Sequence, residues 1–187
     1  MKKHIITVTG YPGSGKSSTA KGTAEKLGYG HFSSGDLFRK MAVERGISIE
    51  EINITAEKQK EIDFEVDTLL RKIGREENDI VIDSRTAFHW IPDSFKVFLK
   101  LNPRTAAERA FKHMQEEGRV SQEGSSVDEV YKNTLERVGS ERKRFWGLYN
   151  LDITDEKQFD LVVDTGLNNL EEVIGIVVAA YQVWLKN

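Results

Sequence analysis

Short apolar runs alternate with longer segments of helical periodicity along the whole chain. Apolar or β-branched runs bounded by turn residues indicate strands, and apolar residues three and four positions apart indicate amphipathic helices. The pattern predicts strands at residues 4–9, 28–32, 79–83, 95–101 and 161–163. It predicts helices at residues 16–27, 35–46, 53–75, 106–117, 127–149 and 170–185.

Two features of this alternation indicate a parallel sheet. Strands that alternate with helices form βαβ units, which place helices on both faces of a sheet. The continuous run of Ile80, Val81 and Ile82 is typical of a strand buried on both faces. We therefore predict an α/β fold, a three-layer sandwich around a five-stranded parallel sheet, in one domain over residues 1–187. Ligands bind such sheets beyond the carboxyl ends of the strands.

Composition narrows the classes of function. The net charge of −3 gives no global electrostatic reason to bind nucleic acid or an anionic membrane. The sequence contains no cysteine, which excludes disulfides, thiolate metal sites and cysteine nucleophiles. We expect a cytoplasmic protein, a monomer rather than an oligomer, whose partners are small molecules and neither nucleic acid nor membrane.

Two apolar stretches could be mistaken for targeting or membrane segments. The run at residues 4–9 is interrupted by Thr7 and Thr9, so it is shorter than the apolar region of a secretory signal. The stretch at residues 173–185 is too short to cross a bilayer. We interpret these stretches as the first strand and the last helix.

Residues 10–17 match the phosphate-binding loop pattern GxxxxGK[ST], between a predicted strand and a predicted helix. Glycines let the backbone curl until its N–H groups converge on phosphate oxygens, and the helix start presents its positive dipole end to the same anion. Lys16 carries charge to the β- and γ-phosphates, and Ser17 offers a hydroxyl to Mg²⁺. The predicted ATP-binding residues are Gly10, Gly13, Ser14, Gly15, Lys16, Ser17 and Ser18.

A second anion site is expected where the second strand ends. Ser34 can cap the helix that begins near Gly35, and the N-terminus of that helix then attracts an anion. Arg39 lies about one turn further on and can reach the same anion. A capping motif followed by a solvated arginine is the alternative interpretation.

The third predicted strand ends in the sequence Asp83-Ser84-Arg85. An acid at this strand end, close to the phosphate loop, suits Mg²⁺-bound water or the acceptor, and Ser17 and Asp83 are the predicted metal residues. Arg85 emerges at the same edge. The alternative is a strand-terminal turn with a surface arginine.

Arg137, Glu141 and Arg144 lie at positions i, i+4 and i+7 of a predicted helix and share one face. On spacing alone we favour an exposed ladder of salt bridges, which contributes a few tenths of a kcal/mol per pair, roughly.

In this order the motifs resemble the nucleoside monophosphate kinases, and most closely the compact, archaeal-type cytidylate kinases. The matching blocks lie at residues 10–17, 33–39, 82–85, 135–145, 148–152 and 162–165. The resemblance spans nearly the whole chain and implies a P-loop kinase fold. It also implies an acceptor-binding helical insertion at about residues 35–75 and a short lid at about residues 113–126.

The resemblance assigns roles to individual residues. Those that it implies for the acceptor are Ser34, Gly35, Asp36, Arg39, Asp63 and Arg85. Asp63 belongs to a helix that walls the acceptor pocket in the family. The implied catalytic residues are Lys16, Arg85, Arg137, Glu141 and Arg144, the last three over the transferring phosphoryl group.

Three segments depart from the family pattern. Ser84 replaces a glycine, which changes how closely the backbone can approach a ligand there. Residues 88–90, Phe-His-Trp, replace a smaller stretch, and we expect a packed loop there rather than base stacking. Residues 112–116 stand where an arginine-bearing lid is usual, and Arg119 is either the substitute or an ordinary surface residue.

The implied reaction transfers the γ-phosphoryl group of ATP·Mg²⁺ to CMP or dCMP. Two other functions stay open. One is another small P-loop kinase that acts on adenylate, shikimate or a related metabolite, and the other is a nucleotide-binding regulatory module without phosphotransfer. The retained Arg137, Glu141 and Arg144 favour a kinase, because a module that only binds nucleotide has less use for a transition-state clamp.

Overall fold

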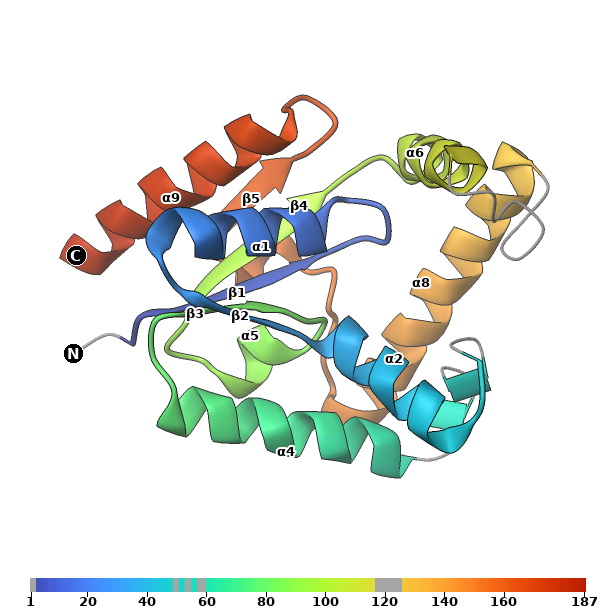
Figure 1. The fold of residues 1–187 in the computed structure, drawn as a ribbon, viewed down its shortest axis with the longest axis horizontal. Coiled ribbons are helices and arrows are strands. Elements are labelled where there is room, and N and C mark those ends of the chain that lie inside the picture. Colours follow the sequence, from blue (N-terminus) through green and yellow to red (C-terminus); the bar gives the residue numbers. More distant parts are fainter. Residues whose placement is uncertain (1–2, 49–50, 53–54, 57–59, 117–125) are drawn as a thin grey trace.

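A five-stranded sheet forms the centre of the molecule (Figure 1). The computed structural model describes residues 3–48, 51–52, 55–56, 60–116 and 126–187. Its strands are β1 (Ile5–Gly10), β2 (Gly30–Ser33), β3 (Ile80–Asp83), β4 (Phe95–Lys100) and β5 (Leu161–Asp164). They lie in the order β2-β3-β1-β4-β5, and every pairing is parallel. The predicted α/β fold with five parallel strands is confirmed.

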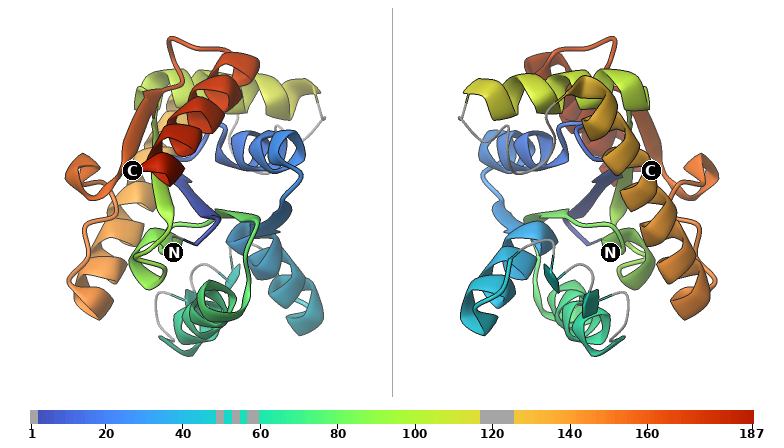
Figure 2. Two further views of the ribbon diagram at one scale, coloured as in Figure 1. Left: turned by 90° about the vertical axis from the view of Figure 1, so that its left-hand side faces the viewer. Right: turned by 90° about the vertical axis from the view of Figure 1, so that its right-hand side faces the viewer.

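Helices cover both faces of this sheet. They are α1 (Lys16–Leu27), α2 (Ser34–Arg45), α4 (Lys60–Glu76), α5 (Ala87–Trp90), α6 (Pro103–Glu116), α8 (Val127–Tyr149) and α9 (Leu170–Lys186). A short 3-10 helix, η1 (Glu156–Gln158), precedes β5. Figure 2 shows α1 and α9 on one side of the sheet and α4 on the other, which gives the predicted three layers.

The face under α1 and α9 holds the larger apolar cluster. Ala20 and Ala24 of α1 and Val177 of α9 are buried there against the strands. The two helices cross closely, because a Cβ atom on Gly22 would lie only 2.3 Å from Cδ1 of Ile174. The last helix of the chain therefore packs on the helix that follows the phosphate loop.

The opposite face is covered by α4 and the single turn of α5. Of the four apolar positions at helical spacing in this segment, Ile62, Val66 and Ile73 are buried, whereas Leu69 is half-buried. The same buried face carries two carboxylates, Asp63 and Asp67. A charged side chain is rarely buried without a partner, so these acids mark a polar site at this edge of the core.

Several element boundaries differ from the expectations. Helix α6 begins at Pro103 rather than at residue 106, because proline suits the first helical position and the Asn102 side chain accepts the N–H of Arg104 at 2.9 Å. Residues 88–90 belong to a helical turn and not to the expected loop. Helix α4 begins at Lys60 in the described part of the chain, and residues 53–54 and 57–59 of the helix predicted at 53–75 lie outside it.

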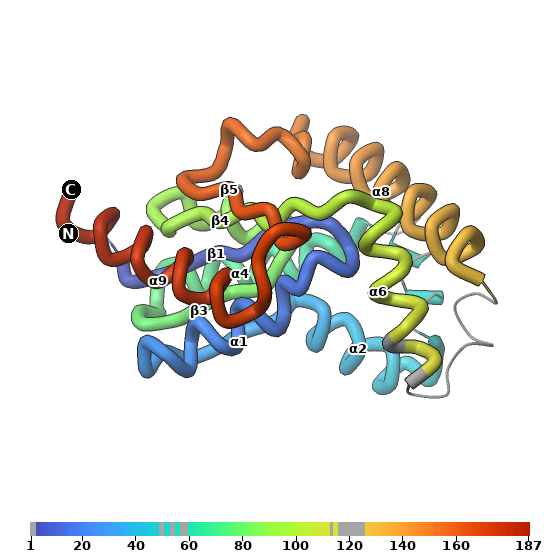
Figure 3. The backbone as a smooth tube through the Cα atoms, turned by 90° about the horizontal axis from the view of Figure 1, so that it is seen from above, coloured from blue at the N-terminus to red at the C-terminus, as the bar shows by residue number. Residues whose placement is uncertain are grey.

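Helices α6 and α8 lie side by side beyond the carboxyl end of the sheet (Figures 1 and 3). Ala107 and Met114 of α6 pack against Val130 of α8. Most of the lid predicted at residues 113–126, including Arg119, lies outside the described residues. Within the described ranges, no helix is long and apolar enough to cross a membrane.

Candidate active site

The phosphate loop connects the central strand β1 to α1, and its glycines are required by the backbone. Gly10 has a φ of 155°, and a Cβ atom there would lie 2.2 Å from the carbonyl oxygen of Leu99. Gly13 and Gly15 have φ values of 75° and 82°. Residues with a Cβ rarely adopt such angles, so the loop conformation depends on glycine at these positions.

Lys16 begins α1, and its ammonium group turns back over the loop. Its Nζ donates to the carbonyl oxygen of Tyr11 at 3.1 Å. Burial, followed by the positive charge of Arg85, lowers the pKa of Lys16 from 10.5 to about 7, although Asp83 and Glu141 act in the opposite direction. No neighbouring group fully neutralises the charged form of Lys16, and an anion bound in the loop would do so.

Asp83 links the start of α1 to the end of β2. Ser17 Oγ donates to Asp83 Oδ2 at 2.5 Å, and Ser33 Oγ contacts the same oxygen at 3.4 Å. A hydroxyl and a carboxylate are the oxygen ligands that Mg²⁺ accepts, with phosphates and waters completing its shell. The described residues contain no group of three or more acids and histidines that could hold a metal ion by itself. The donor set at Ser17 and Asp83 thus fits Mg²⁺ bound together with a phosphate ligand.

The N-cap of α2 is Ser33, and the prediction of Ser34 as the cap is wrong. The backbone N–H of Asp36 donates to Ser33 Oγ at 3.3 Å, and Ser34 is the first helical residue. Strand β2 ends one residue later than expected, which moves the cap with it. Ser34 Oγ is buried without a hydrogen-bond partner in the described structure, and Arg39 pairs with Asp36 at the surface.

Arg85, Glu141 and Arg137 form a charged cluster beside the phosphate loop. Arg85 donates to Glu141 Oε2 at 2.7 Å and to the carbonyl oxygen of Gly10 at 2.8 Å. Arg137 donates to Glu141 Oε1 at 3.1 Å. Although burial acts to raise it, the two arginines lower the pKa of Glu141 from 4.5 to about 2. The exposed ladder favoured from spacing alone is wrong for Glu141, whose side chain is only 12% exposed.

Arg144 turns away from this cluster and contacts α4. Its Nε lies 3.5 Å from Asp63 Oδ2, and the side chains of Arg144 and Asp63 are 12% and 5% exposed. Burial raises the pKa of Asp63 to about 6, against the attraction of Arg144 and with repulsion from Asp67 and Glu141. The structure thus places one predicted catalytic residue against one predicted acceptor residue.

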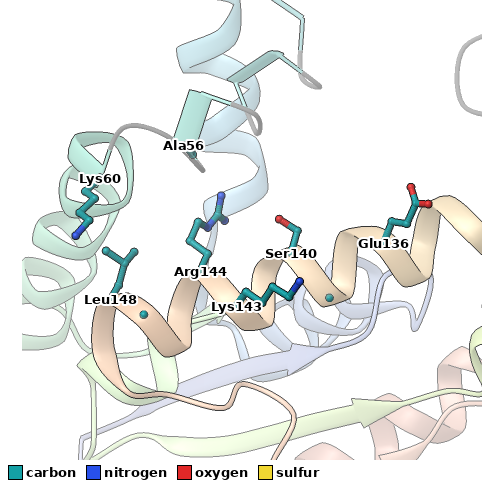
Figure 4. A pocket seen from close by; sticks show the side chains of 9 residues that line it. Ala56, Lys60, Glu136, Ser140, Lys143, Arg144 and Leu148 are labelled. Carbon is teal, nitrogen blue, oxygen red and sulfur yellow. The ribbon is translucent and has the colours of Figure 1, made fainter.

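A cavity of about 710 Å³ lies between α8 and the residues Ala56 and Lys60. Its lining includes Ala56, Lys60, Ser140, Lys143 and Arg144. Figure 4 shows the side chain of Arg144 projecting from α8 toward the segment that carries Ala56. A cavity of this size, lined by a few polar groups, suits a small-molecule ligand.

Sequence reasoning missed the polar network around Asp67. This carboxylate accepts hydrogen bonds from Trp90 Nε1 at 2.6 Å, from Thr86 Oγ1 at 3.4 Å and from the hydroxyl of Tyr149. The guanidinium of Arg71 lies 3.9 Å from the centre of the Trp90 ring. The sequence indicates this network only through the position of Asp67. That acid follows Asp63 by four residues and so lies on the same face of the predicted amphipathic helix.

The chain is similar to cytidylate kinases over nearly its whole length, and to a shikimate kinase in fold. A family model described as an AAA domain matches residues 9–127. The cytidylate kinase of Methanothrix thermoacetophila is 35% identical over 94% of this chain and 96% of its own length. The cytidylate kinase of Pyrococcus abyssi is 38% identical over 94% of this chain and 92% of its own length. The shikimate kinase structure from Bacteroides thetaiotaomicron has a TM-score of 0.63 at 18% identity, covers 98% of both chains and shares the fold.

Proposed function

Because the chain belongs to the cytidylate kinase family, with an AAA-domain match over residues 9–127, we propose that it transfers the γ-phosphoryl group of ATP to CMP or dCMP. The observation that carries the proposal is the position of Arg85. Its guanidinium contacts Gly10 of the phosphate loop and Glu141 of α8 at the same time. A kinase needs its cations where donor and acceptor phosphates meet, and the contacts of Arg85 with the phosphate loop and with α8 support this role for it.

The donor side of the site is the loop with α1. The triphosphate is proposed to be held by backbone N–H groups of the loop and by the serine and lysine side chains. The residues are Gly10, Gly13, Ser14, Gly15, Lys16, Ser17 and Ser18. Ser17 and Asp83 would hold Mg²⁺. When bound, that ion neutralises charge on the β- and γ-phosphate oxygens.

The acceptor side is the start of α2 with Arg85. The residues proposed to hold the acceptor monophosphate are Ser34, Gly35, Asp36 and Arg39, and Arg85 would contact its phosphate. The acceptor phosphate is already anionic, so transfer requires no strong general base. Arg85 and Arg137 would offset the repulsion between two polyanions by electrostatics and positioning, and the ionised Glu141 holds both arginines ready.

Water must be excluded because it would compete with the acceptor for the phosphoryl group. We propose that the insertion at about residues 35–75 and the lid at about residues 113–126 close over bound substrates. The cavity beside α8 supports this proposal, because it offers space for an acceptor within the part of the molecule that would close. In this proposal residues 1–187 form one kinase domain that acts as a cytoplasmic monomer on nucleotides.

ATP binding is expected to be accompanied by proton uptake that grows as the pH rises through 7. Lys16 loses its proton around that pH in the ligand-free protein, whereas the triphosphate favours the charged lysine and raises its pKa. At pH 8 binding should take up nearly one more proton through Lys16 than at pH 6. Calorimetry in buffers of different ionisation enthalpy measures this number.

The variant Lys16→Arg is the control for proton uptake, because guanidinium stays protonated throughout this range. Its uptake should lose the component that rises between pH 6 and pH 8. Equal uptake at both pH values in the unmodified protein would show that Lys16 is charged before ATP binds.

The proposed reaction is tested with purified protein, ATP·Mg²⁺ and a panel of acceptors. ADP should form with CMP or dCMP, and not with AMP or shikimate. Turnover with shikimate or AMP alone would assign the chain to another kinase activity. ATP binding without turnover on any acceptor would support the regulatory module instead.

A further inference from the structure

Three segments of the chain meet at the buried carboxylate of Asp67, which is 6% exposed. Its Oδ1 accepts from Trp90 Nε1 at 2.6 Å and from Thr86 Oγ1 at 3.4 Å, and its Oδ2 accepts from the hydroxyl of Tyr149. Burial raises the pKa of Asp67 in spite of these three bonds. A buried charge costs desolvation energy, and an apolar residue of similar size often stabilises a fold equally well. Stability alone therefore does not account for a carboxylate at this position.

The hydrogen bonds of Asp67 reach two segments that carry members of the charged cluster beside the phosphate loop. Thr86 directly follows Arg85 in the chain. Tyr149 is the last residue of α8, and Figure 1 shows α8 ending close to α4. Glu141 lies on the same helix, about 12 Å before Tyr149 along the axis. Asp67 thus holds both of the segments whose side chains, Arg85 and Glu141, meet at 2.7 Å.

The contact between Arg85 and Glu141 depends on the relative position of these two segments. Arg85 donates to Glu141 through Nε and to the carbonyl oxygen of Gly10 through Nη1, so the plane of its guanidinium is fixed. The apolar packing of Phe88 with Phe145, between α5 and the end of α8, is non-directional and tolerates small shifts. Hydrogen bonds to one carboxylate are directional and do not tolerate them. The network around Asp67 therefore sets a register that the apolar packing leaves free.

We propose that Asp67 is a positioning residue for phosphoryl transfer, which holds the segment after β3 and the end of α8 so that Arg85 and Glu141 meet beside the phosphate loop. It acts through its hydrogen-bond partners and touches no reacting atom. This inference rests on the proposed function, in which Arg85 serves donor and acceptor phosphates together. A misplacement of about 1 Å can cost about 100-fold in rate, even when the mutation lies far from the chemistry.

The first test removes one hydroxyl with the variant Tyr149→Phe. Its kcat should fall by about 10- to 100-fold, because α8 loses its bond to Asp67, while the KM values for ATP and CMP stay within about twofold. The matched control is Tyr29→Phe, which also removes a half-buried hydroxyl, one that lies 3.3 Å from the hydroxyl of Tyr181. Tyr29 precedes β2 at the amino end of the sheet, so its loss should leave kcat unchanged. Steady-state kinetics and urea denaturation of both variants separate kcat from stability.

The route of the effect is tested in a background without the guanidinium of Arg85. Arg85→Lys keeps the charge but cannot hold Glu141 and Gly10 through one planar group. If Asp67 acts by positioning Arg85, Tyr149→Phe should lower kcat by less than about twofold in this background. A loss of stability that does not involve Arg85 would instead lower kcat by the same factor in both backgrounds.

Three results would overturn the positioning role. Tyr149→Phe could lower kcat no more than Tyr29→Phe does, its effect could be equal with and without Arg85, or it could raise the KM for CMP at unchanged kcat, which indicates a contact with the acceptor. In each case phosphoryl transfer to CMP still stands. An unmodified protein that turns over no monophosphate would instead contradict the proposed function.

A second measurement follows the bond between Arg85 and Glu141 directly and needs no turnover. In ¹⁵N-labelled protein, the Nε–H signal of Arg85 is assigned by its absence from Arg85→Lys. Because the bond to Glu141 protects this proton, its exchange with water should become about 10-fold faster in Tyr149→Phe and stay unchanged in Tyr29→Phe. An unchanged exchange rate in Tyr149→Phe would show that Asp67 does not set this contact.

Discussion

Replacement of Arg137 by alanine should lower kcat by about 100- to 1,000-fold and leave the affinity for ATP nearly unchanged. Arg137 reaches the site from α8 and contacts the Glu141 carboxylate, so its guanidinium can respond to charge that develops on the transferring phosphoryl group. Its side chain is 56% exposed, and the fold should therefore tolerate its loss. Steady-state kinetics with ATP and CMP, together with ATP titration, measure both effects.

Lys132→Ala is the matched control for Arg137. It removes the same charge from the same helix, and Lys132 also forms an i,i+4 ion pair with a glutamate, Glu136. Its side chain is 75% exposed, and its removal should leave kcat unchanged. Equal, small effects in both variants would return Arg137 to an ordinary surface salt bridge.

Gly10→Ala should cost about 3 kcal/mol or more of unfolding free energy and abolish ATP binding. The added Cβ would meet the carbonyl oxygen of Leu99 at 2.2 Å, and that oxygen belongs to a strand that pairs with β1. Neither backbone can move without breaking the centre of the sheet. Urea denaturation and ATP titration report the two losses.

The control for Gly10 is Gly28→Ala, which separates backbone strain from the clash. Gly28 has a φ of 70°, but no atom lies within 4 Å of the position that its Cβ would take. This variant should lose only about 1–2 kcal/mol, the cost of a left-handed residue with a side chain, and bind ATP normally. Similar losses in the two variants would mean that strain alone determines the effect at Gly10.

The fold could be predicted because most of its signals are local. Buried parallel strands require continuous apolar runs, and the covering helices require apolar stripes. Both patterns can therefore be recognised in a single sequence. The ends of helices and strands depend on small differences between competing local interactions. Ser33 and Ser34 are both good caps, and the length of β2 decides between them. Residues 88–90 form a helical turn because Thr86 accepts the N–H groups of His89 and Trp90.

The candidate site was only partly visible in the sequence. The loop glycines, Lys16 and Ser17 follow from a local motif with a definite physical reason. The Asp67 network joins segments far apart in the chain, and no spacing rule connects residue 67 with residues 90 and 149. Helical spacing placed Arg137 and Arg144 on one stripe, but it could not indicate that α4 brings Asp63 to only one of them.

The crossing of α1 and α9 has a consequence for synthesis on the ribosome. The phosphate loop is translated well before α9, which packs on α1 at Gly22 and Ile174. Domains generally fold as units once their residues are available. A nascent chain arrested before residue 170 carries the whole loop but lacks the helix that covers α1. The chain should therefore become able to hold ATP only after α9 has left the exit tunnel.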